Sequence, residues 1–169
     1  MNNKLKLLIL LLCPLSFGVS AKMVQNTKAV ETYSKQLDET QRILKETQET
    51  LSVSHSILEM YKNLGYMTPE VVAVSRHFIQ LEEDSKKLYG DNLIMNPTPF
   101  SSCVTLPSAA YNFWQAKLSA LKNNNADVVN SLGQSYIKQG KECVDAIKNP
   151  PPKMIEENDN LEIIDVDTP

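Results

Sequence analysis

The fold is decided by the stretch KMVQNTKAVETYSKQLDETQRILKETQETLSVSHSILEMYKN (residues 22–63), which contains neither proline nor glycine. Apolar residues recur at every seventh position, at Met23, Val30, Leu37, Leu44, Leu51 and Leu58. Three residues further on lies a weaker, mostly polar column, made of Tyr33, Thr40, Thr47, Ser54 and Tyr61. A sustained seven-residue repeat predicts one long helix that packs along another helix with coiled-coil geometry. The polar column weakens that seam, so we expect the helix to need partners inside or outside the chain.

A second helix is predicted to follow a break at residues 63–68. Gly65 is a natural C-terminal cap, and Thr68-Pro69-Glu70 is typical of a helix start. The apolar face of this helix is formed by Val71, Val74, Phe78, Leu81 and Leu88. Residues 89–92 stop the helix. The next segment, 93–107, contains three prolines and is predicted to be an irregular connector.

Two more helices are predicted around the turn Asn123-Asn124-Asn125, from residue 110 to 122 and from 129 to 147. Cys103 and Cys143 lie at equal distances along the chain from residue 123, so an antiparallel hairpin brings them level. We therefore predict a Cys103–Cys143 disulfide of structural type, since the pair lacks CxxC spacing. The predicted fold class is all-α, an elongated helical bundle with one long N-terminal helix and a disulfide-linked C-terminal helical hairpin.

The first 21 residues predict a cleavable secretory signal peptide. Lys4 and Lys6 precede the apolar run Leu7–Leu12, and Val19-Ser20-Ala21 supplies the small residues that a signal peptidase accepts. The apolar stretch is shorter than the about 20 residues of a spanning helix. Two alternatives are an uncleaved anchor and a lipoprotein modified at Cys13. Cleavage leaves a periplasmic or secreted bacterial protein that is not integral to the membrane, with an even pair of cysteines.

Charge is distributed unevenly between the predicted helical domain (22–148) and the predicted acidic, disordered tail (149–169). The domain holds 14 basic and 14 acidic residues, whereas the tail holds six acidic residues and Lys153. A neutral domain without a basic stripe argues against a nucleic-acid partner. Low aromatic content and high acidity are typical of disorder. The alternative for the tail is a segment that docks on a partner through Leu161, Ile163, Ile164 and Val166.

The sequence contains no catalytic constellation, so we expect neither an enzyme nor a cofactor. His55 and His77 lack ligands at metal-binding spacing, and Glu82-Glu83-Asp84 are consecutive residues that point in different directions on a helix. The aromatic residues Tyr111, Phe113 and Trp114 fit a helical core; the alternative is that they form an exposed anchor for a protein partner.

The leader, the Gln- and Thr-rich first helix (Val24–Thr27 and Gln36–Leu51), the short middle helical piece and the terminal helical segment resemble the minor pilus subunits of bacterial type IV secretion and conjugation systems. The resemblance implies a periplasmic helical-bundle protein at the pilus tip, which contributes to pilus assembly and to attachment to the recipient cell. This chain is shorter than those subunits and adds a cysteine pair and an acidic tail.

Function is therefore expected to lie in contacts with protein partners in the cell envelope, and an oligomer is compatible with the sequence. Two alternatives are a periplasmic holdase or assembly chaperone, and a small secreted inhibitor or effector. The chaperone would use the long helix as a tentacle and form a trimer, although the neutral charge disfavours it. The inhibitor would use the aromatic segment 93–114 as its contact surface.

Overall fold

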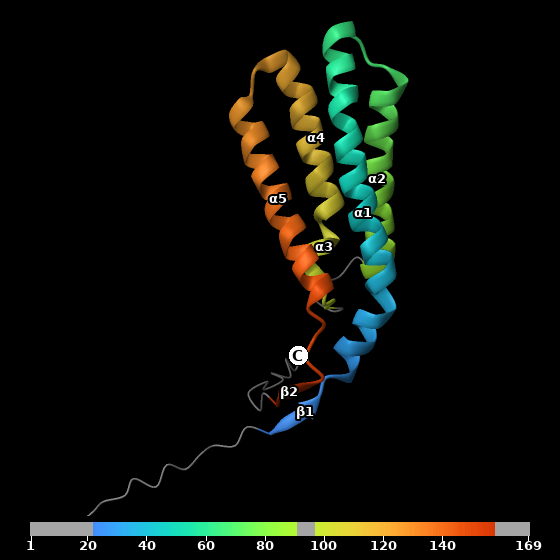
Figure 1. Ribbon diagram of the computed structural model, residues 1–169, viewed down its shortest axis with the longest axis vertical. Helices are drawn as coiled ribbons and strands as arrows, with labels where there is room; N and C mark the ends of the chain where they lie inside the picture. The colour runs from blue at the N-terminus through green and yellow to red at the C-terminus, as the bar shows by residue number, and fades with distance from the viewer. Residues whose placement is uncertain (1–21, 91–96, 158–169) are drawn as a thin grey trace, which may run out of the picture.

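The computed structural model describes residues 22–90 and 97–157 as an elongated helical bundle with a small β-ribbon at one end (Figure 1). The helices are α1 (Thr27–Leu64), α2 (Pro69–Tyr89), α3 (Ser101–Val104), α4 (Leu106–Asn123) and α5 (Ala126–Lys148). The ribbon consists of β1 (Met23–Gln25) and β2 (Met154–Glu156). The predicted mostly helical bundle with one long N-terminal helix is confirmed. The signal peptide predicted at residues 1–21 lies outside the described residues.

The long helices form two antiparallel hairpins, α1–α2 and α4–α5 (Figure 1). Helix α4 packs against both α1 and α2, whereas α5 packs mainly on α4 and lies on the opposite side of the bundle from α2. The α1–α2 and α4–α5 turns lie together at one end of the bundle, which we call the distal end. At this end, α1 and α4 are each followed by a C-cap residue with a left-handed backbone conformation. These residues are Gly65 after α1 and Asn124 after α4.

The most buried positions of α1 belong to the polar column rather than to the leucine column. Thr40, Thr47 and Ser54 are buried, and their hydroxyls donate to the carbonyls of Gln36, Ile43 and Leu51 at 2.6–2.7 Å. The leucines Leu37, Leu44, Leu51 and Leu58 are only half-buried. Small side chains that satisfy their own hydroxyls allow α1 to approach its neighbours closely. The polar column therefore belongs to the buried face of α1, while its effect on the strength of the packing stays a prediction.

Two apolar clusters form the core. The larger one joins α1, α2 and α4 and contains Tyr61, Val71, Val74, Phe78, Leu81, Ala110, Trp114 and Leu118. The smaller one, at the opposite end of α2, contains Tyr89, Phe100, Cys103, Leu106 and Cys143. Four of the five residues predicted for the apolar face of α2 are fully buried. Helix α5 contributes only Gly133 and Cys143 to the fully buried residues, so it is the least embedded of the four long helices.

The first element of the described residues is a strand, although the sequence predicts a helix from Lys22. Met23–Gln25 pairs antiparallel with Met154–Glu156, with Val24 opposite Ile155. The Asn26 N–H donates to the Lys153 carbonyl at 2.9 Å, and the Glu157 N–H donates to the Lys22 carbonyl at 2.7 Å. The prolines at 150–152 follow the end of α5, and the backbone after them runs to the strand Met23–Gln25. The prediction of a disordered tail is therefore wrong for 154–156, while 158–169 lies outside the described residues.

The predicted irregular connector contains the short helix α3 and the start of α4. Pro107 is tolerated because it occupies the first turn of α4, where its missing N–H breaks no hydrogen bond. Phe100 is buried and stacks on Tyr33, with ring centroids 4.9 Å apart. The Ser85 hydroxyl donates to the Val104 carbonyl at 2.7 Å. These contacts hold α3 against the bundle.

Candidate functional site

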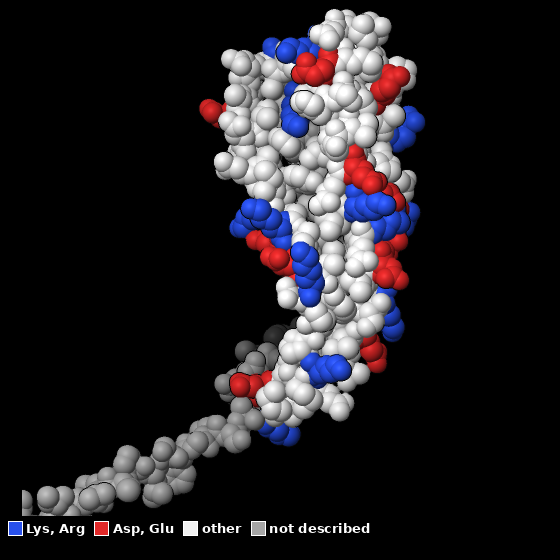
Figure 2. Space-filling view, viewed as in Figure 1, with Lys and Arg blue, Asp and Glu red and all other residues white. Residues whose placement is uncertain are grey.

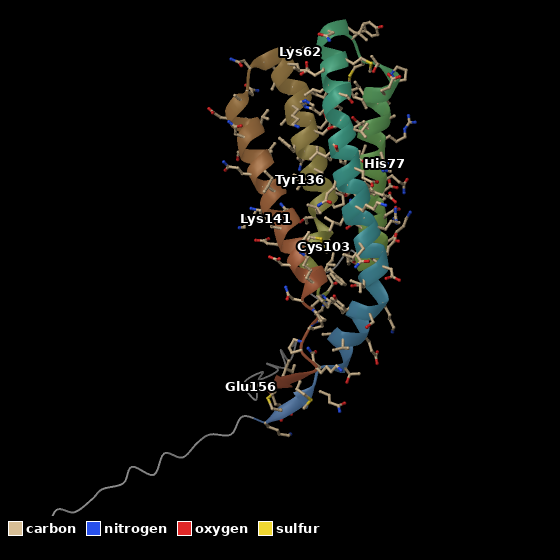
Figure 3. All side chains as sticks on the ribbon, in the orientation of Figure 1. Lys62, His77, Cys103, Tyr136, Lys141 and Glu156 are labelled. Carbon is tan, nitrogen blue, oxygen red and sulfur yellow. A yellow bond between two sulfur atoms is a disulfide. The ribbon has the colours of Figure 1, made fainter. Side chains whose placement is uncertain are left out.

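A disulfide joins Cys103 on α3 to Cys143 on α5, as the sequence predicts. The two Cα atoms are 4.7 Å apart, 40 residues separate the cysteines along the chain, and both side chains are buried (Figure 3). Such a bond forms and persists in oxidising compartments. The disulfide therefore indicates an oxidising, extracytoplasmic location.

The structure places the three aromatic residues of α4 in different environments. Trp114 is fully buried, and its indole N–H donates to the Ser75 hydroxyl at 2.9 Å. Trp114 is therefore a core residue that links α4 to α2, as the core interpretation predicts, and its buried side chain does not fit the alternative of an exposed anchor. Tyr111 is half-buried against the larger core cluster. A partner contact of Tyr111 stays a prediction.

Phe113 is half-buried between α4 and α5. A Cβ built on Gly133 would lie 3.0 Å from Cε2 of Phe113, so the ring occupies the space that a side chain would fill. The ring also stacks near Tyr136, at 6.2 Å between centroids, and the Lys117 ammonium lies 4.3 Å from its centroid. Burial lowers the pKa of Lys117. These contacts join the two helices of the hairpin, while contact of Phe113 with a partner stays a prediction.

Ion pairs centred on Arg42 connect α1 and α2. Its guanidinium lies 2.6 Å from Glu39, 2.9 Å from Glu46 and 2.8 Å from Asp84. The hydrogen bonds that Arg42 donates lower the pKa of the Glu39 and Asp84 carboxyls. Of the three consecutive acidic residues 82–84, Asp84 binds Arg42, Glu82 pairs with Lys86 at 2.8 Å and Glu83 is exposed. The three acids therefore occupy separate environments.

The two histidines lie far apart in the sequence and on different helices. His55 is exposed on α1, and Nε2 of His77 on α2 lies 3.8 Å from a Glu46 oxygen. Within residues 22–90 and 97–157, no three His, Cys, Asp or Glu side chains are grouped so that they could hold a metal ion.

The distal end gathers exposed apolar side chains that the sequence analysis missed. Leu64, Tyr66 and Met67, which are 47%, 61% and 59% exposed, form the α1–α2 turn. Half of the exposed large apolar residues in the described chain lie at this end: Leu64, Tyr66, Met67, Val72, Leu121 and Val128. White, uncharged atoms cover the tip of the α1–α2 turn in Figure 2. The signal was present in the sequence, because turns between helices are usually polar and this one reads Leu-Gly-Tyr-Met.

Two grooves run along the sides of the bundle. One lies between α1 and α2, has a volume of about 380 Å³ and is lined mainly by apolar side chains that include Val53, Ile57 and Ala73. The other lies between α1 and α5, measures about 440 Å³ and is bordered by Gln48, Tyr136 and Ile137 among others. Neither groove follows from the sequence, because each depends on how far neighbouring helices splay.

Comparison of the chain with protein families, with curated proteins and with solved structures finds no match. Among the helices in the described part of the chain, none is long and apolar enough to cross a membrane.

Proposed function

We propose that this protein is an exported, non-enzymatic component of a bacterial cell-envelope assembly, and specifically a minor pilus subunit of a type IV secretion or conjugation system. It acts by protein–protein contact. The sequence resemblance suggests the particular system, and the signal peptide delivers the chain to the periplasm. The disulfide agrees with that compartment.

The observation that carries the proposal is the apolar distal end. Tyr66 and Met67 stand in the turn where α1 meets α2, at the end of the bundle opposite the β-ribbon (Figure 1). Exposed patches of apolar groups mark interaction sites, and tyrosine is among the residue types enriched in contact hot spots. The tip therefore serves as the contact with the partner.

Contacts along the bundle join the helices that carry this tip. The Arg42 ion pairs join α1 to α2, the Trp114–Ser75 hydrogen bond joins α4 to α2, and the disulfide joins α3 to α5. The elongated bundle presents this small apolar surface at the end opposite the β-ribbon (Figure 1).

The proposal is tested by deleting the gene in the bacterium of origin and measuring pilus formation and the frequency of conjugative transfer. The wild-type gene should restore both. A Tyr66→Ser/Met67→Ser variant should be exported and folded but should restore transfer poorly. Ile79→Ser is the matched control, because Ile79 is exposed on α2 away from the turn and should be dispensable.

Two results would contradict the proposal. Unchanged pili and transfer after deletion would exclude the pilus role, and aggregation of envelope proteins in that strain would instead favour the chaperone alternative. Full restoration by the Tyr66/Met67 variant would exclude the distal tip as the contact surface.

A further inference from the structure

The groove between α1 and α2 has an apolar floor and an acidic rim. Val53 is 56% exposed on one wall, and Ala73 lies on the other. Its acidic lining residues are Glu49 and Glu70, His77 also lines it, and none of the lysines or arginines that the structure describes does. A hydrogen bond from its own backbone N–H lowers the pKa of Glu70, so this rim group is charged at neutral pH. Lys45 lies 3.8 Å from Glu49 but outside the groove.

Helix α5 carries a surface of the opposite character. Ile137 is 54% exposed, nearly the same fraction as Val53, and it stands beside Gln134, Lys138 and Lys141, with Glu142 as an acidic neighbour on this surface. We call Gln134, Ile137, Lys138 and Lys141 the α5 ridge. Figure 2 shows blue basic side chains over α5 with red acidic atoms beside them, and Figure 3 labels Lys141 there. Lys138 is paired only loosely with Glu142, at 3.9 Å, and its side chain is largely exposed.

The two surfaces match in size and in charge. The groove residues span positions 49–57 of α1 and 70–77 of α2, which at 1.5 Å per residue is about two helical turns. The α5 ridge spans positions 134–141, also about two turns. An apolar side chain flanked by lysines fits an apolar groove flanked by carboxylates, as in helix-in-groove recognition.

We propose that the α5 ridge of one copy of this chain docks into the α1–α2 groove of a second copy. The groove and the ridge lie on opposite flanks of the bundle, with His77 and Lys141 marking the two sides in Figure 3. One copy therefore cannot fill its own groove, and the contact is heterologous. Such a contact builds a ring if the rotation closes and an open chain of subunits if it does not. The inference goes beyond the proposed function, because self-association belongs to the purified chain whatever assembly it joins.

Sedimentation of the purified, disulfide-bonded protein over a wide concentration range tests the proposal through charge reversal. Glu49→Lys/Glu70→Lys reverses the groove, and Lys138→Glu/Lys141→Glu reverses the ridge. Each variant alone should associate at least about tenfold more weakly than wild type, since like charges then face each other. An equimolar mixture of the two variants should regain wild-type association, because each groove again meets a ridge of opposite charge. Circular dichroism and the melting temperature check that both variants fold.

Cysteine cross-linking supplies a geometric readout. A Val53→Cys protein mixed with an Ile137→Cys protein should form a disulfide-linked heterodimer under mild oxidation. Ile79→Cys mixed with Ile137→Cys is the matched control and should cross-link far less, because Ile79 lies outside the groove. A protein that stays monomeric at every concentration overturns the proposal. So does association that neither charge reversal weakens, or weakening that mixing does not repair.

Discussion

Gly133 on α5 faces the ring of Phe113 on α4 so closely that a methyl group would lie 3.0 Å from Cε2 of the ring. A glycine inside a helix costs stability, and here its small size allows the two helices of the hairpin to approach. Gly140, about two helical turns further along α5, has a different environment: the nearest neighbour of a Cβ built there would be Cδ1 of Leu106, at 3.9 Å. Gly133 therefore allows close packing of α5 on α4, whereas the site of Gly140 has room for a larger side chain.

Alanine substitution should separate them. Gly140→Ala should stabilise the protein by about 0.5–1 kcal/mol, because alanine favours the helix and the added methyl group has room. Gly133→Ala should gain less or destabilise, since Phe113 must move, and Gly133→Val should destabilise by about 1–3 kcal/mol. Chemical denaturation of the three variants measures the differences. Equal stabilisation by both alanines would show that Phe113 does not press on α5.

Loss of the disulfide should weaken the bundle substantially. For a closed loop of 40 residues, the chain-entropy account gives about 4 kcal/mol. The Cys103→Ser/Cys143→Ser double variant should therefore unfold at much lower denaturant concentration than the oxidised protein. Non-reducing mass spectrometry should show no free thiol at either position in the wild-type protein. Two free thiols in the exported protein would refute the bond.

The burial of Trp114 has a spectroscopic consequence, because it is the single tryptophan of the chain. Its fluorescence should be blue-shifted in the folded protein and should move to the red on unfolding. Ser75→Ala removes the acceptor of the indole N–H and should cost about 1–3 kcal/mol, as expected for a buried donor left unpaired. Ser52→Ala on the exposed side of α1 is a control expected to be neutral. Emission typical of water in the native state would contradict the burial.

Acid should remove the contribution of the Arg42 ion pairs. Arg42 lowers the pKa of Glu39 and Asp84 below their usual 4.5 and 3.8. Their stabilisation is therefore complete above those usual values and is lost as the pH falls through the lower values of the folded chain. Arg42→Met should cost up to about 1 kcal/mol at neutral pH, since the groups are partly exposed. The difference from wild type should shrink as the pH is lowered below about 4.

Denaturation curves of wild type and Arg42→Met across this pH range provide the measurement. Lys45→Met is the control, because the Lys45–Glu49 pair is exposed and 3.8 Å long. A difference between Arg42→Met and wild type that does not change with pH would show that the carboxylates contribute nothing through Arg42.

The helices and the disulfide could be predicted because their signals are local. The seven-residue repeat and the cap at Gly65 each depend on residues close together in the sequence. The disulfide follows from the position of residue 123, midway between the two cysteines, because a helical hairpin that turns there brings them level. The β-ribbon could not be predicted in the same way. It pairs residues about 130 positions apart through strands of three residues, too short to show an alternating pattern.

Side-chain burial was harder to predict than helix position. The threonines of α1 indicate weak packing when only the sequence is considered. Thr40 and Thr47 can nevertheless be buried, because each hydroxyl donates a hydrogen bond to a backbone carbonyl one turn earlier. Trp114 could be read as core or as an exposed anchor until the packing of α4 against α2 decided the matter. The distal tip was detectable at Tyr66 and Met67, whereas the grooves depend on the angles between helices, which no residue pattern in the chain fixes.

The central claim, that the protein acts through its distal tip on a partner in the envelope, is tested most directly by photo-cross-linking in living cells. A photoreactive amino acid is placed at position 66, and at position 79 as the matched control. The account predicts that position 66 cross-links to one pilus or secretion subunit, identified by mass spectrometry, and that position 79 does not. No adduct at position 66 in cells that export and fold the protein would contradict it, as would the same adducts at both positions.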